Sequence, residues 1–296
     1  MRLLGQQRLL SQLFRTISFV LLVPFFLCAD VRPFSPLKKD NRYEEIDRLE
    51  ADRRLADFRN QRLIGDFCFR FELEHLPRRG ATVRYYGTMW GSWNEQGPVT
   101  RIALQRHTEA EDELPLELIL QNGPNAQAWL REDLSGRFVP IAGAALFEPL
   151  LPGVVYAPFD FLMPFLYWSD YRYEGAKRVR SRVARDFILS PGSTSEIPDW
   201  LEAVRIGIDD TYNALLTIDV LETAGAKRSS FTVESFKQVQ GQWIVKRIVM
   251  KDWETKDRTR FKVLSASVGL HLNEAAFSPV AGIDAPIINE LMFEKM

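Results

Sequence analysis

The strongest structural signal in the chain is QWIVKRIVMKDWETKDRTRFKV, residues 242–263. Two runs rich in isoleucine, valine and phenylalanine flank the charged segment at 252–257. β-Branched and aromatic residues favour strands, and a charged segment between two such runs is typical of a turn. The stretch therefore predicts a pair of strands joined by a charged turn, and it indicates that a sheet organises this chain.

The same period-two pattern extends outward from this hairpin. Phe67, Phe69 and Phe71 alternate with mostly polar residues, which predicts a strand with one apolar face. Further strand patterning covers 82–90, 99–106, 116–121, 126–131, 171–190, 201–209, 214–222 and 229–239. The pattern amounts to about ten or eleven strands with short connections and no βαβ alternation. We predict a mainly β (α+β) fold, with one antiparallel sheet domain over residues 63–279.

The chain between residues 144 and 168 is very apolar and is interrupted by prolines, so long strands are excluded there. We predict one or two short helices with kinks at Pro149 and Pro164. One interpretation is that this segment covers the core. The alternative is a lid over an apolar cavity that holds lipid or acyl chains. The candidate hydrophobic-ligand residues are Phe159, Phe161, Leu162, Phe165, Leu166 and Trp168 in the segment, and Phe67, Phe69 and Phe71 on the sheet.

The sharpest basic feature is formed by Arg178, Arg180, Arg182 and Arg185, with Lys177. Arg178, Arg180 and Arg182 alternate with Val179 and Ser181. Residues two apart on a strand lie on one face, so the three arginines are expected to share a face. One interpretation is contact with an anion such as a phosphate head-group. The alternative is an exposed sheet face whose charges are balanced by acidic residues on neighbouring strands.

The first 29 residues have the organisation of a secretory signal peptide. Arg2, Arg8 and Arg15 precede an apolar run at 17–28, and cleavage is expected after Ala29. The run is shorter than the ~20 residues that a transmembrane helix needs. We therefore predict export to the periplasm, with a retained anchor or an amphipathic helix as the alternative.

The sequence also predicts what flanks the sheet domain. Residues 30–62 are expected to hold a linker and then a helix that is capped by Asn41, with Glu44 three residues later as the second half of a capping box. Residues 280–296 are expected to form a tail with a short helix near 287–293.

Motifs for catalysis or metal binding are missing from the sequence. There is no His-Glu-x-x-His, Cys-x-x-Cys, Gly-x-Ser-x-Gly or phosphate-binding loop, and the three histidines, His75, His107 and His271, are far apart in the chain. The net charge of −1 gives no field that recruits nucleic acid. We therefore predict no catalytic residue, no metal, no cofactor and no nucleic-acid partner. A hydrolase built from His107, His271 and carboxylates is the least favoured alternative.

Within the opening stretch, Trp243 and the spacing Met250-x-Asp252-x-x-Thr255-x-x-x-Thr259 resemble the outer-membrane lipoprotein-sorting family, whose members have a LolA-like fold. Segments at 175–191, 204–209 and 215–225 are similar to the preceding strands of that family, although Ser181 stands where the family has glycine. The resemblance covers residues 155–279. It implies an incomplete, strongly curved antiparallel β-barrel with helices over its mouth and a concave face that receives acyl chains.

Together these features favour a non-catalytic periplasmic carrier, whose partners are lipid or acylated lipoprotein cargo and proteins of the inner or outer membrane. The alternative is a structural or interaction protein of the envelope that has the same fold and a filled core. The hairpin residues Met250, Asp252, Thr255 and Thr259 are interpreted as register and turn positions. A binding site is expected opposite that hairpin, under the segment at 144–168.

Overall fold

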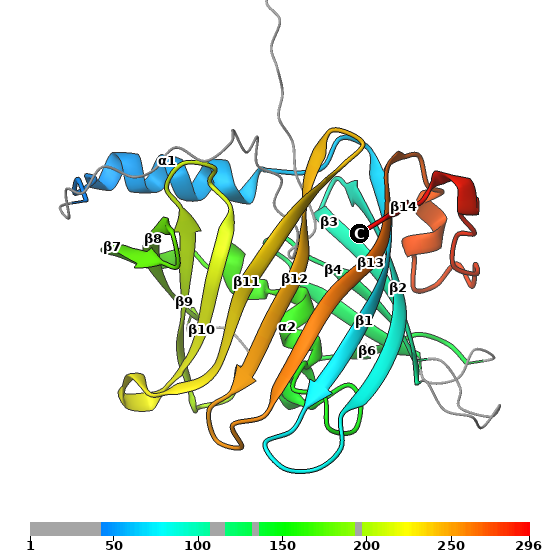
Figure 1. Ribbon diagram of the computed structural model, residues 1–296, viewed down its shortest axis with the longest axis horizontal. Coiled ribbons are helices and arrows are strands. Elements are labelled where there is room, and N and C mark those ends of the chain that lie inside the picture. The colour runs from blue at the N-terminus through cyan, green and yellow to red at the C-terminus, as the bar shows by residue number, and fades with distance from the viewer. Residues whose placement is uncertain (1–42, 107–115, 132–135, 193–196) are drawn as a thin grey trace, which may run out of the picture.

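One antiparallel sheet of fourteen strands forms the body of the protein. The computed structural model describes residues 43–106, 116–131, 136–192 and 197–296. The strands are hydrogen-bonded in the order β6-β5-β4-β3-β2-β1-β13-β12-β11-β10-β9-β8-β7, and β14 pairs with β13 outside this path. The sheet curves strongly without joining its edge strands β6 and β7, so it forms the incomplete barrel that was predicted (Figure 1).

The strands vary in length from two to thirteen residues. Their bounds are β1 Asp66–Leu76, β2 Val83–Asn94, β3 Gly97–Arg106, β4 Leu116–Gln121, β5 Gln127–Arg131, β6 Val139–Ile141, β7 Asp170–Val179, β8 Arg182–Ser190, β9 Leu201–Asp209, β10 Leu215–Glu222, β11 Lys227–Val239, β12 Gln242–Asp252, β13 Arg258–Leu270 and β14 Glu294–Lys295. The count exceeds the prediction of about ten or eleven. β6 and β14 are too short to show a period-two pattern in the sequence, which is one reason why the prediction was low.

The hairpin predicted from the opening stretch is confirmed as β12 and β13. Met250 pairs with Thr259 across the two strands. The Asp252 carboxylate accepts the backbone N–H groups of Glu254 and Thr255, both at 2.7 Å, and thereby closes the turn. This use of an aspartate side chain as a local acceptor explains why a charged segment without glycine can form the connection.

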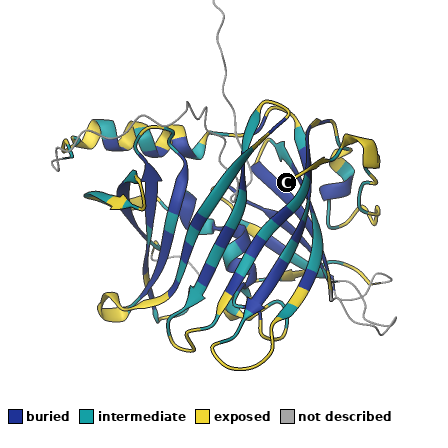
Figure 2. Ribbon diagram, viewed as in Figure 1, coloured by how far each residue is buried: buried dark blue, intermediate teal, exposed yellow. Residues whose placement is uncertain are grey.

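The core lies on the concave side of the sheet. Buried positions recur along the strands of the curved sheet (Figure 2). On β1, Phe67, Phe69 and Phe71 belong to the main apolar core, and each is at most 1% exposed. The neighbouring strand β2 places Gly91 opposite Phe67 and Gly87 opposite Phe71. A Cβ atom at Gly91 would come within 1.9 Å of the Phe67 ring, so the glycine leaves the space that the ring fills. The predicted apolar face of this strand is therefore confirmed as core.

Helix α1 (Arg48–Arg59) lies along one open end of the sheet (Figure 1). Asp47 caps it by accepting the Glu50 N–H at 2.8 Å, so the predicted start at Asn41 is wrong. Asn41 itself lies outside the described residues, and 43–47 are not helical. The sequence contains a second capping pattern, Asp47 with Glu50 three residues later, and the helix begins at this pattern and not at Asn41.

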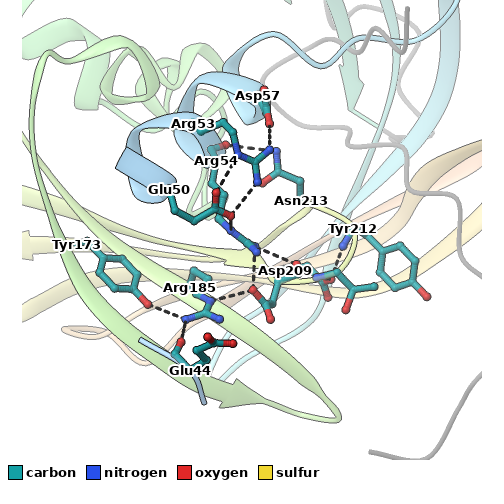
Figure 3. Close-up of polar contacts among 12 residues, drawn as sticks. Glu44, Glu50, Arg53, Arg54, Asp57, Tyr173, Arg185, Asp209, Tyr212 and Asn213 are labelled. Atoms are coloured by element: carbon teal, nitrogen blue, oxygen red, sulfur yellow. Dashed lines mark hydrogen bonds and ion pairs between the residues drawn. The ribbon is translucent and has the colours of Figure 1, made fainter. Parts of the chain in front are cut away.

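An ion-pair cluster fastens α1 to the turn between β9 and β10 (Figure 3). Arg54 donates to the Asp210 carboxylate at 2.8 Å, and the buried Arg185 of β8 donates to the same oxygen at 2.8 Å. Arg185 also donates to the Tyr173 hydroxyl at 3.0 Å. Partly buried pairs that share hydrogen bonds are screened less than exposed ones, so the cluster fixes the helix across this end of the sheet.

Among the described residues, three short helices follow β6: η1 (Gly143–Phe147), α2 (Pro158–Leu162) and η2 (Pro164–Tyr167), and we call residues 143–168 the cover. Helices α2 and η2 bury side chains in the concave interior, and η1, which has no buried residue, packs beside α2. Met163 has a φ of 46° and interrupts the helical path between α2 and η2, just before Pro164. The kink predicted at Pro164 is therefore confirmed. Arg59 of α1 donates to the carbonyl of Leu166 and, at 2.7 Å, to that of Trp168. The end of the cover is therefore tied to α1.

The C-terminal residues pack on the convex side. There η4 (Glu274–Phe277) contributes Phe277 to a second apolar cluster with Cys68 and Trp90. A 3₁₀ turn, η5 (Glu290–Met292), occupies part of the region where a short helix is predicted, and η3 (Thr223–Gly225) connects β10 to β11. In the part of the chain that the structure describes, no helix has both the length and the apolar character needed to cross a membrane.

Candidate functional site at the mouth of the sheet

A cleft of about 450 Å³ opens between the cover and the ends of β10, β11 and β12. Its lining includes Thr255 and Asp257 of the turn between β12 and β13. This turn lies at the end of the sheet opposite α1 (Figure 1). The cover lines it with Ala144, Phe147, Glu148, Pro149, Gly153, Val154, Val155, Ala157, Phe159 and Asp160. The facing residues are Pro198, Trp200, Val220, Arg228, Ser229, Met250, Asp252, Thr255 and Asp257.

A small void of about 10 Å³ lies at the inner side of the cleft, under α2. Asp160, Val220, Ser229 and Met250 line both spaces, so the two adjoin. The void has room for about one water molecule. Of these two adjoining spaces, only the cleft is large enough to hold a ligand.

Aromatic rings form one wall of the cleft. The rings of Phe147 and Phe159 stack with centroids 4.5 Å apart, and Phe147 meets the edge of Trp200 at 5.2 Å. The Arg228 guanidinium lies 4.2 Å from the Trp200 ring centre and donates to Glu222 at 2.9 Å. The wall thus combines a partly exposed apolar surface with a cation that is already paired.

Asp160 is the one charged residue in the apolar run from 154 to 168. It projects from α2 into the cleft, and its carboxylate accepts the Ala157 N–H at 2.8 Å. Burial among apolar groups raises the pKa of the Asp160 carboxyl to about 7, and the Ala157 hydrogen bond only partly opposes this rise. The carboxyl therefore changes charge near neutral pH.

The turn between β12 and β13 forms the opposite wall. Asp252 and Asp257 line the cleft, while Asp257 also accepts the Arg78 backbone N–H at 2.7 Å. His75 is buried beside Gly153, and burial lowers the pKa of its imidazole although the neighbouring Asp257 opposes this. The cleft accordingly lies between the cover and the hairpin, whose residues contribute to its lining as well as to the fold.

The predicted hydrophobic-ligand residues fall into two groups. Phe159 lines the cleft and Phe165 lines the inner void. Phe161, Leu162 and Leu166 are at most 6% exposed within the main core, and so are Phe67, Phe69 and Phe71, while Trp168 packs partly buried against the same core. A role for any of them in ligand binding stays a prediction.

The predicted shared face of Arg178, Arg180 and Arg182 is wrong. Arg180 and Ser181 form the turn between β7 and β8, so Arg178 and Arg182 lie on two different strands. Arg180 donates to Glu234 at 3.1 Å, and Arg182 donates to Asp209 at 3.1 Å. Acidic residues thus balance two of the three charges, and an anion contact there stays a prediction.

The remaining candidates for chemistry are dispersed. His75 lies near the C-terminal end of β1, where it pairs with Thr259. His271 lies at the opposite end of the same strand pair, directly after Leu270, which pairs with Asp66. His107 lies outside the described residues. Burial raises the pKa of the Cys68 thiol to about 12, which keeps it protonated and unreactive. Within the described ranges, no three His, Cys, Asp or Glu residues are grouped so that they could hold a metal ion.

Sequence reasoning missed Phe147, Asp160, Trp200 and Arg228. Asp160 could have been identified from the sequence, because a lone carboxylate within an apolar run must face either a partner or a solvent-filled space. The other three come from separate segments, and only the curvature of the sheet brings them together.

Comparison with known proteins supports the fold. No family model and no curated protein matches the sequence. A solved domain from Vibrio parahaemolyticus, named for outer membrane lipoprotein sorting, aligns with a TM-score of 0.65 at 13% identity over 79% of this chain and 98% of that one. A DUF1329 family protein from Desulfovibrio piger gives a TM-score of 0.63 at 11% identity, over 77% of this chain and 95% of that one.

A LolA superfamily protein from Nitrosomonas europaea aligns with a TM-score of 0.56 at 13% identity, over 79% of this chain and 98% of that one. These similarities, together with the open curved sheet and its interior helices, define the architecture. The protein has a LolA-like fold, as the resemblance of the Trp243–Thr259 segment implied.

Proposed function

We propose that the chain is an exported, non-catalytic protein of the cell envelope that binds or carries hydrophobic or lipid-modified cargo. The observation that carries the proposal is the cleft of about 450 Å³ between the cover and the sheet. Its volume falls within the ~300–1,000 Å³ range of small-molecule sites. The shared fold with a domain named for outer membrane lipoprotein sorting supports the same assignment.

The lining suits an apolar chain. Phe147, Phe159 and Trp200 offer flat aromatic surface, and Met250 offers a flexible thioether that adapts to different shapes. Each CH₂ group removed from water contributes about 0.8 kcal/mol, so even a partly covered acyl chain gains several kcal/mol. The signal-like composition of residues 1–29 supports a carrier in the periplasm. Its proposed partners are lipid or acylated lipoprotein and the membrane proteins that load or receive it.

A second candidate is a structural or interaction protein of the envelope. Its supporting observation is the filled core, in which the inward rings of Phe67, Phe69 and Phe71 are at most 1% exposed. A protein of this kind needs no cargo, and its cleft is a surface feature. The two candidates therefore differ in whether the folded protein takes up hydrophobic molecules.

The test is extraction and mass spectrometry of lipids from natively purified protein, together with titration of the mature chain with a fluorescent fatty acid. The Trp200→Ala variant removes one of the three aromatic rings in the wall of the cleft and is expected to weaken uptake about tenfold, the effect of losing a large aromatic contact with the ligand. Trp93→Ala is the matched control, because Trp93 is also a partly buried tryptophan with a nearby arginine, Arg62, at 5.2 Å, but lies outside the cleft. Absence of both uptake and co-purified lipid overturns the carrier and leaves the structural role.

A further inference from the structure

We propose that the cleft takes an amphiphile whose polar group is a cation, such as a protonated amine, and that Asp160 is the carboxylate that receives it. This inference rests on the proposed function and specifies its ligand. It follows from which charges face the cleft, how they are already paired, and where the carboxylate stands relative to the apolar wall.

The described part of the lining is acidic. Glu148, Asp160, Asp252 and Asp257 face the space, and Arg228 is the cation among the described lining residues. Arg228 is engaged, since it pairs with Glu222 and stacks on Trp200. An anionic head-group placed in the cleft would share Arg228 with Glu222 and lie among like charges, which costs free energy.

Apart from Arg228, the basic residues that gather around Trp253 at this mouth lie on the other face of the sheet. Strand residues alternate between faces, so Met250 and Asp252 line the cleft while Lys251 and Trp253 face outward. Lys251, Lys227 and Lys256 gather around the Trp253 ring at 3.4, 5.9 and 5.3 Å. Strand alternation therefore separates an acidic interior from a basic exterior at the same rim.

Asp160 lies at the boundary between the acidic lining of the cleft and the apolar lining of the inner void. It lines both the cleft and the inner void, whose other walls include Met163, Phe165 and Phe231. One carboxylate oxygen accepts the Ala157 N–H, and among the described residues no ion pair joins Asp160 to a cation. The buried Tyr156 is a titratable neighbour of Asp160, and it carries no charge at neutral pH because burial raises the pKa of its phenol. A ligand cation is the group that completes this site.

An organic cation fits better than a metal ion. The carboxylates of the cleft come from separate elements, and within the described ranges no group of three such side chains could hold a metal. An alkylammonium needs one or two acceptors and an apolar surface for its chain. Asp160 and the Phe147–Phe159 stack provide both within one cleft.

The experiment compares three probes of equal chain length, dodecylamine, dodecanoate and dodecanol, titrated below their micellar concentrations into the mature protein at pH 8. Dodecylamine is expected to bind at least about tenfold more tightly than the other two, as a charge-assisted hydrogen bond predicts. Asp160→Asn keeps an oxygen acceptor for the Ala157 N–H and is expected to abolish the preference while leaving dodecanol binding intact. Glu254→Gln, an exposed carboxylate of the β12–β13 turn outside the lining, is expected to leave the preference unchanged.

Each outcome decides between the two proposals. Equal binding of the three probes, or preference for dodecanoate, overturns the cationic ligand and leaves the carrier. A preference for dodecylamine that survives Asp160→Asn and is lost in Glu148→Gln overturns the role of Asp160. Failure of all three probes to bind overturns the proposed function together with this inference.

Discussion

Replacing Asp160 by asparagine should change how stability depends on pH. The folded protein holds the pKa of the Asp160 carboxyl at about 7, against an ordinary value of 3.8, because α2 buries it among apolar side chains. Since the folded pKa is raised, the folded state binds the proton more tightly than the unfolded state does. Stability is therefore lost as pH rises from about 4 through 7.

The size of the effect follows from the shift. Each pKa unit corresponds to about 1.36 kcal/mol. At pH 8 the carboxylate is ionised in both states, so the rise of the pKa from 3.8 to about 7 destabilises the folded state by roughly 4 kcal/mol. At pH 5 the folded carboxyl stays protonated while the unfolded one ionises, and the penalty is roughly 2 kcal/mol. The asparagine side chain is neutral at both pH values and retains an acceptor for the Ala157 N–H. The variant should therefore be more stable than the wild type, and its advantage should grow by about 3 kcal/mol between pH 5 and pH 8.

Urea unfolding followed by tryptophan fluorescence measures this difference directly. Subtracting the wild-type free energy from that of the variant at each pH cancels the titration of other groups, among them Asp186, whose carboxyl pKa is also raised by burial. Asp186→Asn therefore serves as a positive control for the method. An Asp160→Asn advantage that stays constant from pH 5 to pH 8 would refute the assignment of a titrating carboxyl to the cleft.

Two further predictions concern the convex side. The Cys68 thiol, with its pKa raised to about 12 by burial, should resist iodoacetamide at pH 8 in the folded protein and react in denaturant; peptide mapping that finds it labelled without denaturant contradicts the packing. Arg101→Ala should lower the free energy of unfolding by about 3–5 kcal/mol, because it removes a buried partner of the buried Glu117 carboxylate. The Arg101 guanidinium is 1% exposed and donates to Glu117 at 2.7 Å and to the Ala276 carbonyl at 2.9 Å. The control, Arg84→Ala, removes an exposed arginine that also pairs with a glutamate and should cost about 1 kcal/mol or less, so equal losses in the two variants would contradict the reasoning.

Local patterning predicted the sheet because each strand carries its own signal. The alternation of Phe67, Phe69 and Phe71 marks a face whatever lies opposite, and the kink at Pro164 follows from the chemistry of proline. The β7–β8 turn escaped prediction because neither Arg180 nor Ser181 is a strong turn former. Arg180 takes a φ of 55°, a conformation that glycine or asparagine usually signals, so the period-two pattern ran through the turn unbroken.

The candidate site was less predictable for a different reason. Its walls are contributed by the cover, by Trp200 before β9 and by the ends of three strands, so no window of sequence contains it. What the sequence did contain was the anomaly of Asp160, a charge without a local partner in an apolar run. Such residues indicate that a space exists, although they do not indicate which distant segments enclose it.

The hairpin that identifies the sheet also binds the cover next to the cleft. The Thr259 hydroxyl accepts the Val155 N–H at 3.0 Å, and the Tyr85 hydroxyl donates to the Pro152 carbonyl at 2.7 Å; these bonds hold the loop between η1 and α2. The other end of the cover is fixed more firmly, because Arg59 donates to two of its carbonyls and α1 is itself bound by ion pairs. Thr259, a residue that pattern analysis assigns to strand register, thus also holds the cover beside the cleft.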